Sequence, residues 1–132
     1  MEYLYYPGCS LKTSGKAYDE SLRAVFRALG VGLTELEDWN CCGATMYMSV
    51  DEAASLAICA RNLALAEQKG SRGLIAPCSA CYTVLLKTNR FLRDSPELKF
   101  KVDHFLGQAG LRYDLTVEVR HPLDVLVNDV GV

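Results

Sequence analysis

The stretch Gly73-Leu74-Ile75-Ala76-Pro77-Cys78-Ser79-Ala80-Cys81 joins a short apolar run, a proline and two cysteines spaced as C-x-x-C. Short apolar runs bounded by glycine and proline are typical of buried strands. We predict a strand over 73–76 and a helix that begins near Ser79. The C-x-x-C pair would then lie at the start of this helix, where exposed amides and the helix dipole favour thiolate over thiol.

The same alternation of strand and helix extends in both directions along the chain. We expect further strands over 3–6, 32–36 and 115–119. We expect helices over about 14–29, from Ser49 or Asp51 to about 69, from Pro96 to near 110, and from Pro122 to about 128. In the first helix the apolar spacing places Tyr18, Leu22, Val25, Phe26 and Leu29 on one face. The pattern predicts one α/β domain over 1–132, a three-layer fold with a four-stranded, mainly parallel sheet and helices on both faces.

Five of the six cysteines follow predicted strands. They are Cys9, Cys41, Cys42, Cys78 and Cys81. In open parallel sheets the carboxyl ends of the strands share one edge, where ligands bind. We therefore expect five thiols at one edge. Cys59 differs, because with Leu56 and Leu63 it falls on the apolar stripe of a helix, so core packing is its expected role.

Composition narrows the possible classes of protein. The chain has 132 residues, of which 50% are hydrophobic and 23% charged, and its net charge is -2. This balance fits a globular domain and argues against a nucleic-acid surface. The start of the chain lacks the basic region of a signal peptide, and the apolar run from Ala53 to Ala66 is too short to span a membrane. We expect a cytoplasmic protein, in which cysteines serve as metal ligands or redox groups rather than structural disulfides.

Three kinds of cysteine site could use such thiols. A thioredoxin-like redox pair shares the C-x-x-C spacing but lacks three further cysteines on the same edge. A structural zinc site needs four ligands, commonly as two C-x-x-C pairs, so five thiols over-supply it. Iron–sulfur clusters are held by thiolates and tolerate varied ligand spacing. Zinc and iron–sulfur both remain open on this argument.

The complete set of motifs is more specific than its parts. Tyr6-Pro7-Gly8-Cys9-Ser10-Leu11, Asp38-Trp39-Asn40-Cys41-Cys42-Gly43-Ala44 and Pro77-Cys78-Ser79-Ala80-Cys81-Tyr82 together resemble the CCG-domain signature of the heterodisulfide reductase B-subunit family. The resemblance covers nearly the whole chain. It implies that the five motif cysteines ligate a non-cubane [4Fe-4S] cluster. In that family paired modules reduce the mixed disulfide of coenzyme M and coenzyme B, with electrons from an iron–sulfur-rich partner subunit.

The chain differs from that family pattern in carrying one CCG motif instead of two. We expect it to be the amino-terminal module of a heterodisulfide reductase-like oxidoreductase that acts on a disulfide or thiol small molecule. Its expected partners are a second CCG module and an iron–sulfur electron-donor subunit. Self-association is the expected alternative to binding these partners. The chain alone should turn over disulfide poorly. The alternative is a zinc-binding or metal-free interaction module without redox activity.

Four further residues are candidates for supporting roles. Gly8 and Gly43 would let the backbone approach a bulky group or adopt positive φ. Trp39 either shields the site from water or is a core aromatic. His121 follows the fourth strand, where it either supports the site or is an ordinary surface histidine.

Overall fold

The computed structural model describes residues 1–42, 52–70 and 73–131. Its four strands form one sheet in the order β2-β1-β3-β4, and every neighbouring pair is parallel. The strands are β1 (Glu2–Tyr5), β2 (Gly32–Glu35), β3 (Gly73–Ile75) and β4 (Glu118–Arg120). In the register, Tyr5 lies opposite both Glu35 and Ile75, and Ile75 lies opposite Arg120. All four strands therefore end in one row.

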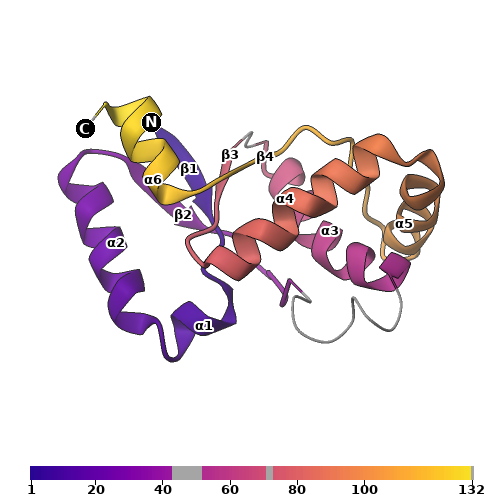
Figure 1. Cartoon of the computed structure of the whole chain (residues 1–132), viewed down its shortest axis with the longest axis horizontal. Helices are drawn as coiled ribbons and strands as arrows, with labels where there is room; N and C mark the ends of the chain where they lie inside the picture. Colours follow the sequence, from indigo (N-terminus) through magenta and orange to yellow (C-terminus); the bar gives the residue numbers. More distant parts are fainter. Residues whose placement is uncertain (43–51, 71–72, 132) are drawn as a thin grey trace.

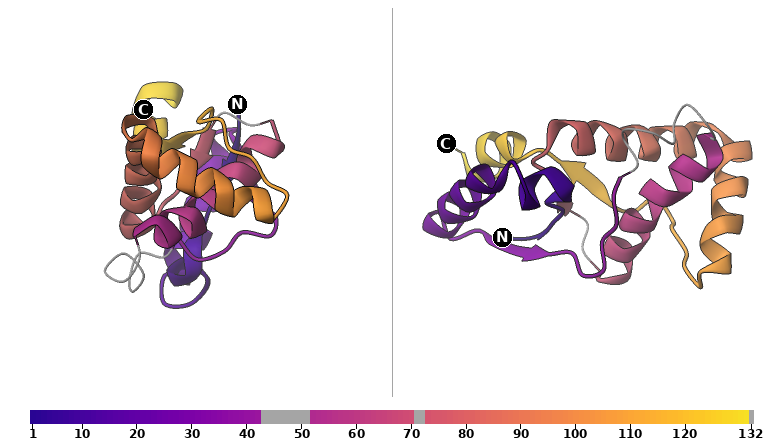
Figure 2. Two further views of the ribbon diagram at one scale, coloured as in Figure 1. Left: turned by 90° about the vertical axis from the view of Figure 1, so that its right-hand side faces the viewer. Right: turned by 90° about the horizontal axis from the view of Figure 1, so that it is seen from below.

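Helices cover both faces of this sheet, so the predicted three-layer α/β fold is confirmed. They are α1 (Gly8–Lys12), α2 (Lys16–Ala28), α3 (Glu52–Gln68), α4 (Ser79–Asp94), α5 (Pro96–Gln108), α6 (Pro122–Asp124) and the π-helical η2 (Val125–Val130). Figures 1 and 2 show α2 and α6 on one side of the strands and α3, α4 and α5 on the other. None of the helices in the described ranges is long and apolar enough to cross a membrane.

Two hydrophobic clusters fill the space between the layers, because successive strand side chains point to opposite faces. Leu4 and Tyr6 of the β1 segment join the larger cluster, which includes buried residues of α3, α4 and α5. Tyr5 points the other way and packs in the smaller cluster with Leu22 and Phe26 of α2. Helix α3 is buried on most of its surface, which explains its apolar sequence.

The buried face of α2 is narrower than its apolar spacing suggests. Leu22 and Phe26 are buried, whereas Tyr18, Val25 and Leu29 are 44%, 42% and 40% exposed. The apolar face predicted for this helix is therefore only partly buried. Asp19 instead takes an inner position, because its carboxylate accepts a hydrogen bond of 2.6 Å from Tyr5 Oη.

The fourth strand begins three residues later than predicted. Leu115 has a φ of +64°, which an extended strand does not allow. The Glu67 carboxylate holds this turn by accepting from the backbone N–H groups of Asp114 and Thr116 at 2.9 and 3.2 Å. The predicted helix over 122–128 is divided between α6 and η2, and α1 was not predicted. The predicted caps Ser49 and Asp51 lie outside the described residues.

Candidate metal centre

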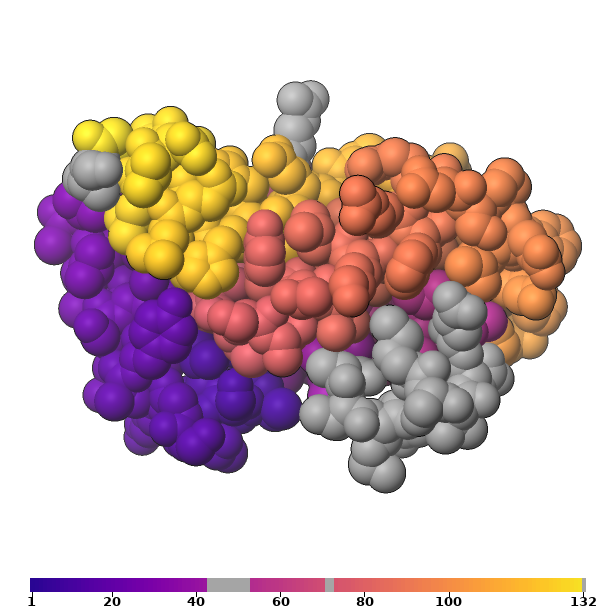
Figure 3. Space-filling model, viewed as in Figure 1, coloured from indigo at the N-terminus to yellow at the C-terminus, as the bar shows by residue number. Residues whose placement is uncertain are grey.

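Each motif cysteine follows the carboxyl end of a strand. Cys9 lies in α1 after β1, and Cys41 and Cys42 follow β2. Cys78 is the N-cap of α4, directly after β3, and Cys81 lies in the first turn of that helix. In Figure 3 the start of α4 lies beside the indigo N-terminal region, which contains α1. The strand ends thus deliver the thiol-bearing turns to the same edge of the sheet.

The sulfur atoms are not all equally close. Cys42 and Cys81 are both buried, and their Sγ atoms lie 3.5 Å apart. Cys9 and Cys41 are exposed, and Cys78 is half-buried. Within the described ranges, no three His, Cys, Asp or Glu side chains stand close enough together to hold a metal ion as they are. The complete five-thiol ligand set therefore remains a prediction.

Gly8 makes room for one of these sulfurs. Its φ is +75°, and a Cβ atom added there would lie 2.9 Å from the Sγ atom of Cys81. Of the two roles expected for Gly8, positive φ is confirmed, and the approach to a bulky bound group stays a prediction. Gly43, for which the same was expected, lies outside the described residues. The absence of a Cβ at Gly8 therefore lets the backbone pack closely against a buried thiol.

The thiols at this edge differ in their tendency to ionise. Partial burial opposes ionisation of Cys78, but hydrogen bonds from the Ser10 side chain and from the thiol and backbone N–H of Cys81 lower the pKa of Cys78. The hydrogen bond with Cys42, burial and the negative charges of Cys42 and Cys78 raise the pKa of Cys81. Neighbouring thiols that repel one another's charge are stabilised as thiolates when a cation binds between them. A positively charged group bound at this edge would therefore stabilise the thiolate forms of these cysteines.

Cys59 is placed as predicted, in the core. It is buried in α3, and burial raises its pKa to about 12 although Thr88 hydrogen-bonds to it. It is within electrostatic reach of Cys41 and Cys42, whose charges contribute to that shift. A thiol with this pKa stays neutral at physiological pH, which suits packing rather than metal ligation.

Aromatic and polar groups close the site around the cysteine pair. Trp39 is half-buried, packs edge-on to Tyr6 with ring centroids 5.4 Å apart, and donates from Nε1 to Glu35 at 3.1 Å. Burial and the charges of nearby thiols raise the pKa of Tyr6, which keeps its hydroxyl as a donor. That hydroxyl donates to the carbonyl of Asn40 at 2.6 Å. This packing supports the role of core aromatic for Trp39, and its role as a shield for the site stays a prediction.

His121 has a structural contact at the end of the fourth strand. Its Nδ1 accepts a hydrogen bond of 3.1 Å from the backbone N–H of Leu123, so it caps α6. Its ring also packs edge-on to Tyr82, with centroids 5.5 Å apart. The capping contact favours the ordinary structural role for His121.

Three supporting residues were not identified from the sequence. Ser10 bonds the Cys78 thiol, and Tyr6 and Asn62 hold the segment before the cysteine pair. Asn62 could have been identified from the sequence, because it is a polar residue inside the apolar run of α3. A buried side-chain amide is normally hydrogen-bonded, so its position indicated a partner in another segment. Ser10 and Tyr6 gave no such signal, since serine after a strand and tyrosine within one are ordinary.

The residues at this edge fit a thiolate-ligated metal group in two respects. The donor atoms are sulfurs, which suit zinc and iron–sulfur clusters. Gly8 lets the backbone lie close to Cys81 without the clash that a Cβ would cause with its sulfur.

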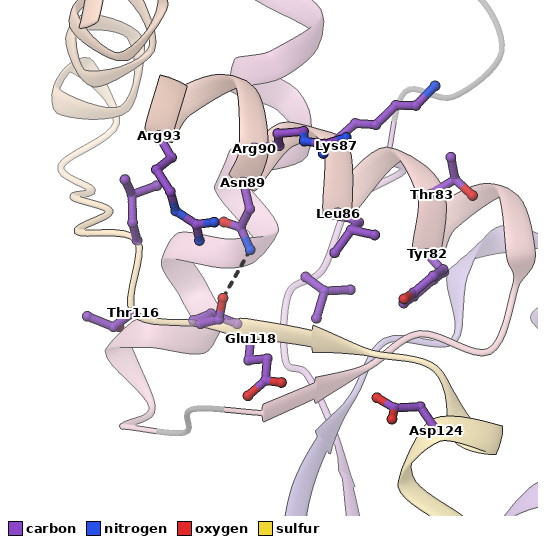
Figure 4. Close-up of a pocket in the computed structure, with 13 residues that line it drawn as sticks. Tyr82, Thr83, Leu86, Lys87, Asn89, Arg90, Arg93, Thr116, Glu118 and Asp124 are labelled. Carbon is purple, nitrogen blue, oxygen red and sulfur yellow. Dashed lines mark hydrogen bonds between the residues drawn. The ribbon is translucent and has the colours of Figure 1, made fainter. Parts of the chain in front are cut away.

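A groove of about 710 Å³ lies away from the thiols, between α4 and the segment that leads into β4 (Figure 4). It begins at Tyr82 and has a basic wall that includes Arg90 and Arg93, but no cysteine lines it. Asn89 closes its floor by donating from Nδ2 to the carbonyl of Val117 at 3.0 Å. The chemistry of the thiol edge, rather than the size of this groove, identifies the candidate site.

A parallel α/β domain that carries cysteines after three of its strands belongs to the class of cysteine-rich domains with metal or redox chemistry at a sheet edge. Comparison with protein families specifies the class, because residues 3–86 match the model of the CCG cysteine-rich domain. The chain belongs to this family. The resemblance seen in its motifs is therefore confirmed.

Named relatives agree with this assignment. The chain is 35% identical over 133 residues to a heterodisulfide reductase B-subunit-like protein of Archaeoglobus profundus, covering 100% of this chain and 44% of the relative. It is 36% identical to the 8-methylmenaquinol:fumarate reductase membrane anchor subunit of Wolinella succinogenes, covering 98% and 44%. It is 30% identical to the B-subunit of the ferredoxin/F(420)H(2)-dependent CoB-CoM heterodisulfide reductase of Methanosarcina acetivorans, covering 94% and 41%. The chain spans less than half the length of these relatives, which support a redox role for it.

Proposed function

We propose that this chain is an iron–sulfur redox module of a protein that resembles the heterodisulfide reductase B-subunit. It would take part in electron transfer to a disulfide substrate and in the reduction of that substrate. The observation that carries the proposal is the placement of five cysteines after three parallel strands that end in one row. The family and the names of its relatives support the redox role.

Cys9, Cys41, Cys42, Cys78 and Cys81 are the proposed ligands of a [4Fe-4S] cluster of the non-cubane kind. When bound, such a cluster supplies one-electron redox chemistry. Cys78 would supply a thiolate at the start of α4, and Gly8 lets the backbone approach Cys81 closely because it has no Cβ. Burial of Cys42 and Cys81 limits the access of water, and burial is one of the factors that set the potential of an iron–sulfur centre.

The complete reaction requires partners. Reduction of one disulfide consumes two electrons and two protons and yields two thiols, whereas one cluster transfers one electron at a time. We therefore propose that residues 1–132 form one CCG module that works with a second module and an iron–sulfur electron-donor subunit, in the reducing cytoplasm. Leu123 and Val127, 64% and 60% exposed, follow His121 and offer apolar surface for such a partner or for self-association. Sedimentation of the isolated chain would measure the self-association.

Anaerobic purification followed by iron, sulfide, zinc and EPR analysis tests the proposal. We expect about four iron and four sulfide per chain and an EPR signal from the reduced or oxidised cluster. One zinc per chain without sulfide would favour the zinc-binding alternative, and a metal-free chain after reconstitution would favour an interaction module. A viologen-driven disulfide assay should then give slow turnover with this chain alone and faster turnover with its partners.

A further inference from the structure

Asn40, the residue before the cysteine pair, has each of its polar groups bonded. Its backbone N–H donates to Asn62 Oδ1 at 2.9 Å, and its carbonyl accepts from Asn62 Nδ2 at 2.9 Å and from Tyr6 Oη at 2.6 Å. Its side-chain amide donates to the carbonyl of Ile58 at 2.9 Å and accepts from Arg61 Nη1, also at 2.9 Å. The backbone leading into Cys41 and Cys42 is thus tied to one face of α3.

Asn62 is the central contact of this arrangement. It is 0% exposed, and one amide group pairs with both the N–H and the C=O of a single backbone residue. Burying an amide in a largely apolar helix is unfavourable unless its donor and acceptor are both satisfied. Both the donor and the acceptor of the Asn62 amide are satisfied by the backbone of Asn40, which belongs to the cysteine-bearing segment, and not by groups of α3.

The segment needs such a contact because it lies beyond the regular sheet. Pairing with β1 continues only to the hydrogen bond of 2.9 Å from Leu36 N–H to the carbonyl of Tyr5. Asp38 then adopts a φ of +60°, and Arg61 holds its carbonyl at 2.8 Å. Beyond this turn, the contacts of Asn40 with Asn62 and Tyr6 direct the chain so that Cys42 is buried and its Sγ faces Cys81.

We propose that Asn62 is a positioning residue, which holds the Cys41–Cys42 backbone in its ligand geometry before any metal binds. The proposal rests on the proposed function in assigning these thiols as ligands, but the positioning itself is a property of the metal-free chain. Partners that orient the ligands of a metal site affect metal affinity by about 10–100-fold when they are removed. Loss of Asn62 would remove the acceptor of the part-buried Asn40 N–H and allow the segment to open.

Asn89 provides a matched control within the same chain. It is also a buried asparagine, on α4, and it also joins a helix to an irregular segment by two side-chain hydrogen bonds. Its Nδ2 donates to the carbonyl of Val117 at 3.0 Å (Figure 4), and its Oδ1 accepts from the hydroxyl of Tyr113. No cysteine lies in that segment. Asn62→Ala and Asn89→Ala each remove two side-chain hydrogen bonds to an irregular segment. Only the bonds of Asn62 lie next to cysteines.

The first measurement uses the metal-free, reduced chain and does not depend on a cluster. The rate of alkylation of each cysteine by N-ethylmaleimide is followed by peptide mass spectrometry in wild type, Asn62→Ala and Asn89→Ala. We expect Cys42 to react at least about 10-fold faster in Asn62→Ala, because opening of the segment exposes it. We expect the Cys42 rate in Asn89→Ala to equal that of the wild type.

The second measurement is the rate of iron release to a chelator after anaerobic reconstitution, together with the EPR spectrum. Asn62→Ala should release iron about 10–100-fold faster than Asn89→Ala and show an altered signal. If wild type takes up no cluster, the proposed function fails while the alkylation result still decides the positioning. If Asn62→Ala does not fold, Asn62→Ser and Tyr6→Phe are compared with Asn89→Ala in its place. Tyr6→Phe removes the hydrogen bond from the Tyr6 hydroxyl to the carbonyl of Asn40. Protection of Cys42 that is unchanged in a folded Asn62 variant, or equally lost in Asn89→Ala, overturns the proposal.

Discussion

Replacement of Gly8 by alanine tests the close approach between α1 and Cys81. The change has two costs. Non-glycine residues in the left-handed region are less stable by about 1–2 kcal/mol, and Gly8 has a φ of +75°. The added Cβ would also lie 2.9 Å from Cys81 Sγ, so the buried sulfur or the helix must shift. Overpacking of a filled interior costs about 1–3 kcal/mol. We expect Gly8→Ala to lower the free energy of unfolding by about 2–5 kcal/mol as the sum of these two ranges.

Gly30→Ala separates the two costs. Gly30 has a φ of +74°, but a Cβ there would meet nothing within 4 Å, so only the backbone cost applies. In a Cys81→Ala background, the contacts left for the Gly8 Cβ are Tyr6 Cε1 at 3.7 Å and the residue 81 Cβ at 3.9 Å, both ordinary van der Waals distances. Gly8→Ala should then cost no more than Gly30→Ala, giving a coupling energy of about 1–3 kcal/mol between positions 8 and 81.

The assay is urea unfolding of the reduced, metal-free variants, followed by circular dichroism under anaerobic conditions. Wild type, the three single variants and the Gly8→Ala/Cys81→Ala double variant form the complete set. Equal destabilisation by Gly8→Ala and Gly30→Ala, or a coupling energy near zero, would refute the argument that Gly8 is required by the sulfur of Cys81.

Further predictions concern the individual thiols. Cys42→Ala should abolish or lower iron loading, whereas Cys59→Ala should keep the iron and lower the free energy of unfolding by about 1 kcal/mol through lost packing. Iron analysis and urea unfolding compare the two variants, and equal iron loss in both would contradict their separate roles. Oxidation of the metal-free chain with diamide should pair Cys42 with Cys81, whose sulfurs lie 3.5 Å apart; peptide mapping that finds another pair first would contradict this. The folded-state pKa of Cys59, about 12, exceeds its ordinary value of 9.0. The contribution of the neutral Cys59 thiol to stability should therefore be complete below about pH 9 and be lost as the pH rises toward 12. Over this pH range the free energy of unfolding of Cys59→Ala should fall less steeply than that of the wild type, as measured by urea unfolding. The pKa of Cys78 is lowered by Ser10 among other groups, so Ser10→Ala should move alkylation of Cys78 to higher pH.

The positions of the strand ends could be predicted because local chemistry determines them. Pro77 and the Pro7-Gly8 pair stop a strand wherever they occur, and the C-x-x-C spacing indicates a helix start. The parallel order then follows from the alternation of elements. This was sufficient to predict that the cysteine-bearing turns meet at one edge, since that result needs topology but no side-chain contact.

Contacts between distant segments could not be predicted in the same way. Tyr18 has the helical spacing of a core residue, and its exposure depends on how much of α2 the narrow sheet covers. The start of β4 depends on Glu67, which lies in another element and accepts from the backbone at Thr116. The pairing of Asn62 with Asn40 likewise joins α3 to a turn through 22 residues of sequence separation. Apolar periodicity describes one element at a time and carries no information on such pairs.

The strand order also determines when the site can first exist during synthesis. β1 pairs with β2 and β3, so the turns that carry Cys9, Cys41 and Cys42 are joined by those of Cys78 and Cys81 only after β3 has entered the sheet. The ribosome must therefore release more than half of these 132 residues before the five thiols can come together. Insertion of the proposed cluster would then follow folding of the domain, and a shortage of iron would leave a folded chain with the exposed thiols of Cys9 and Cys41 at its surface.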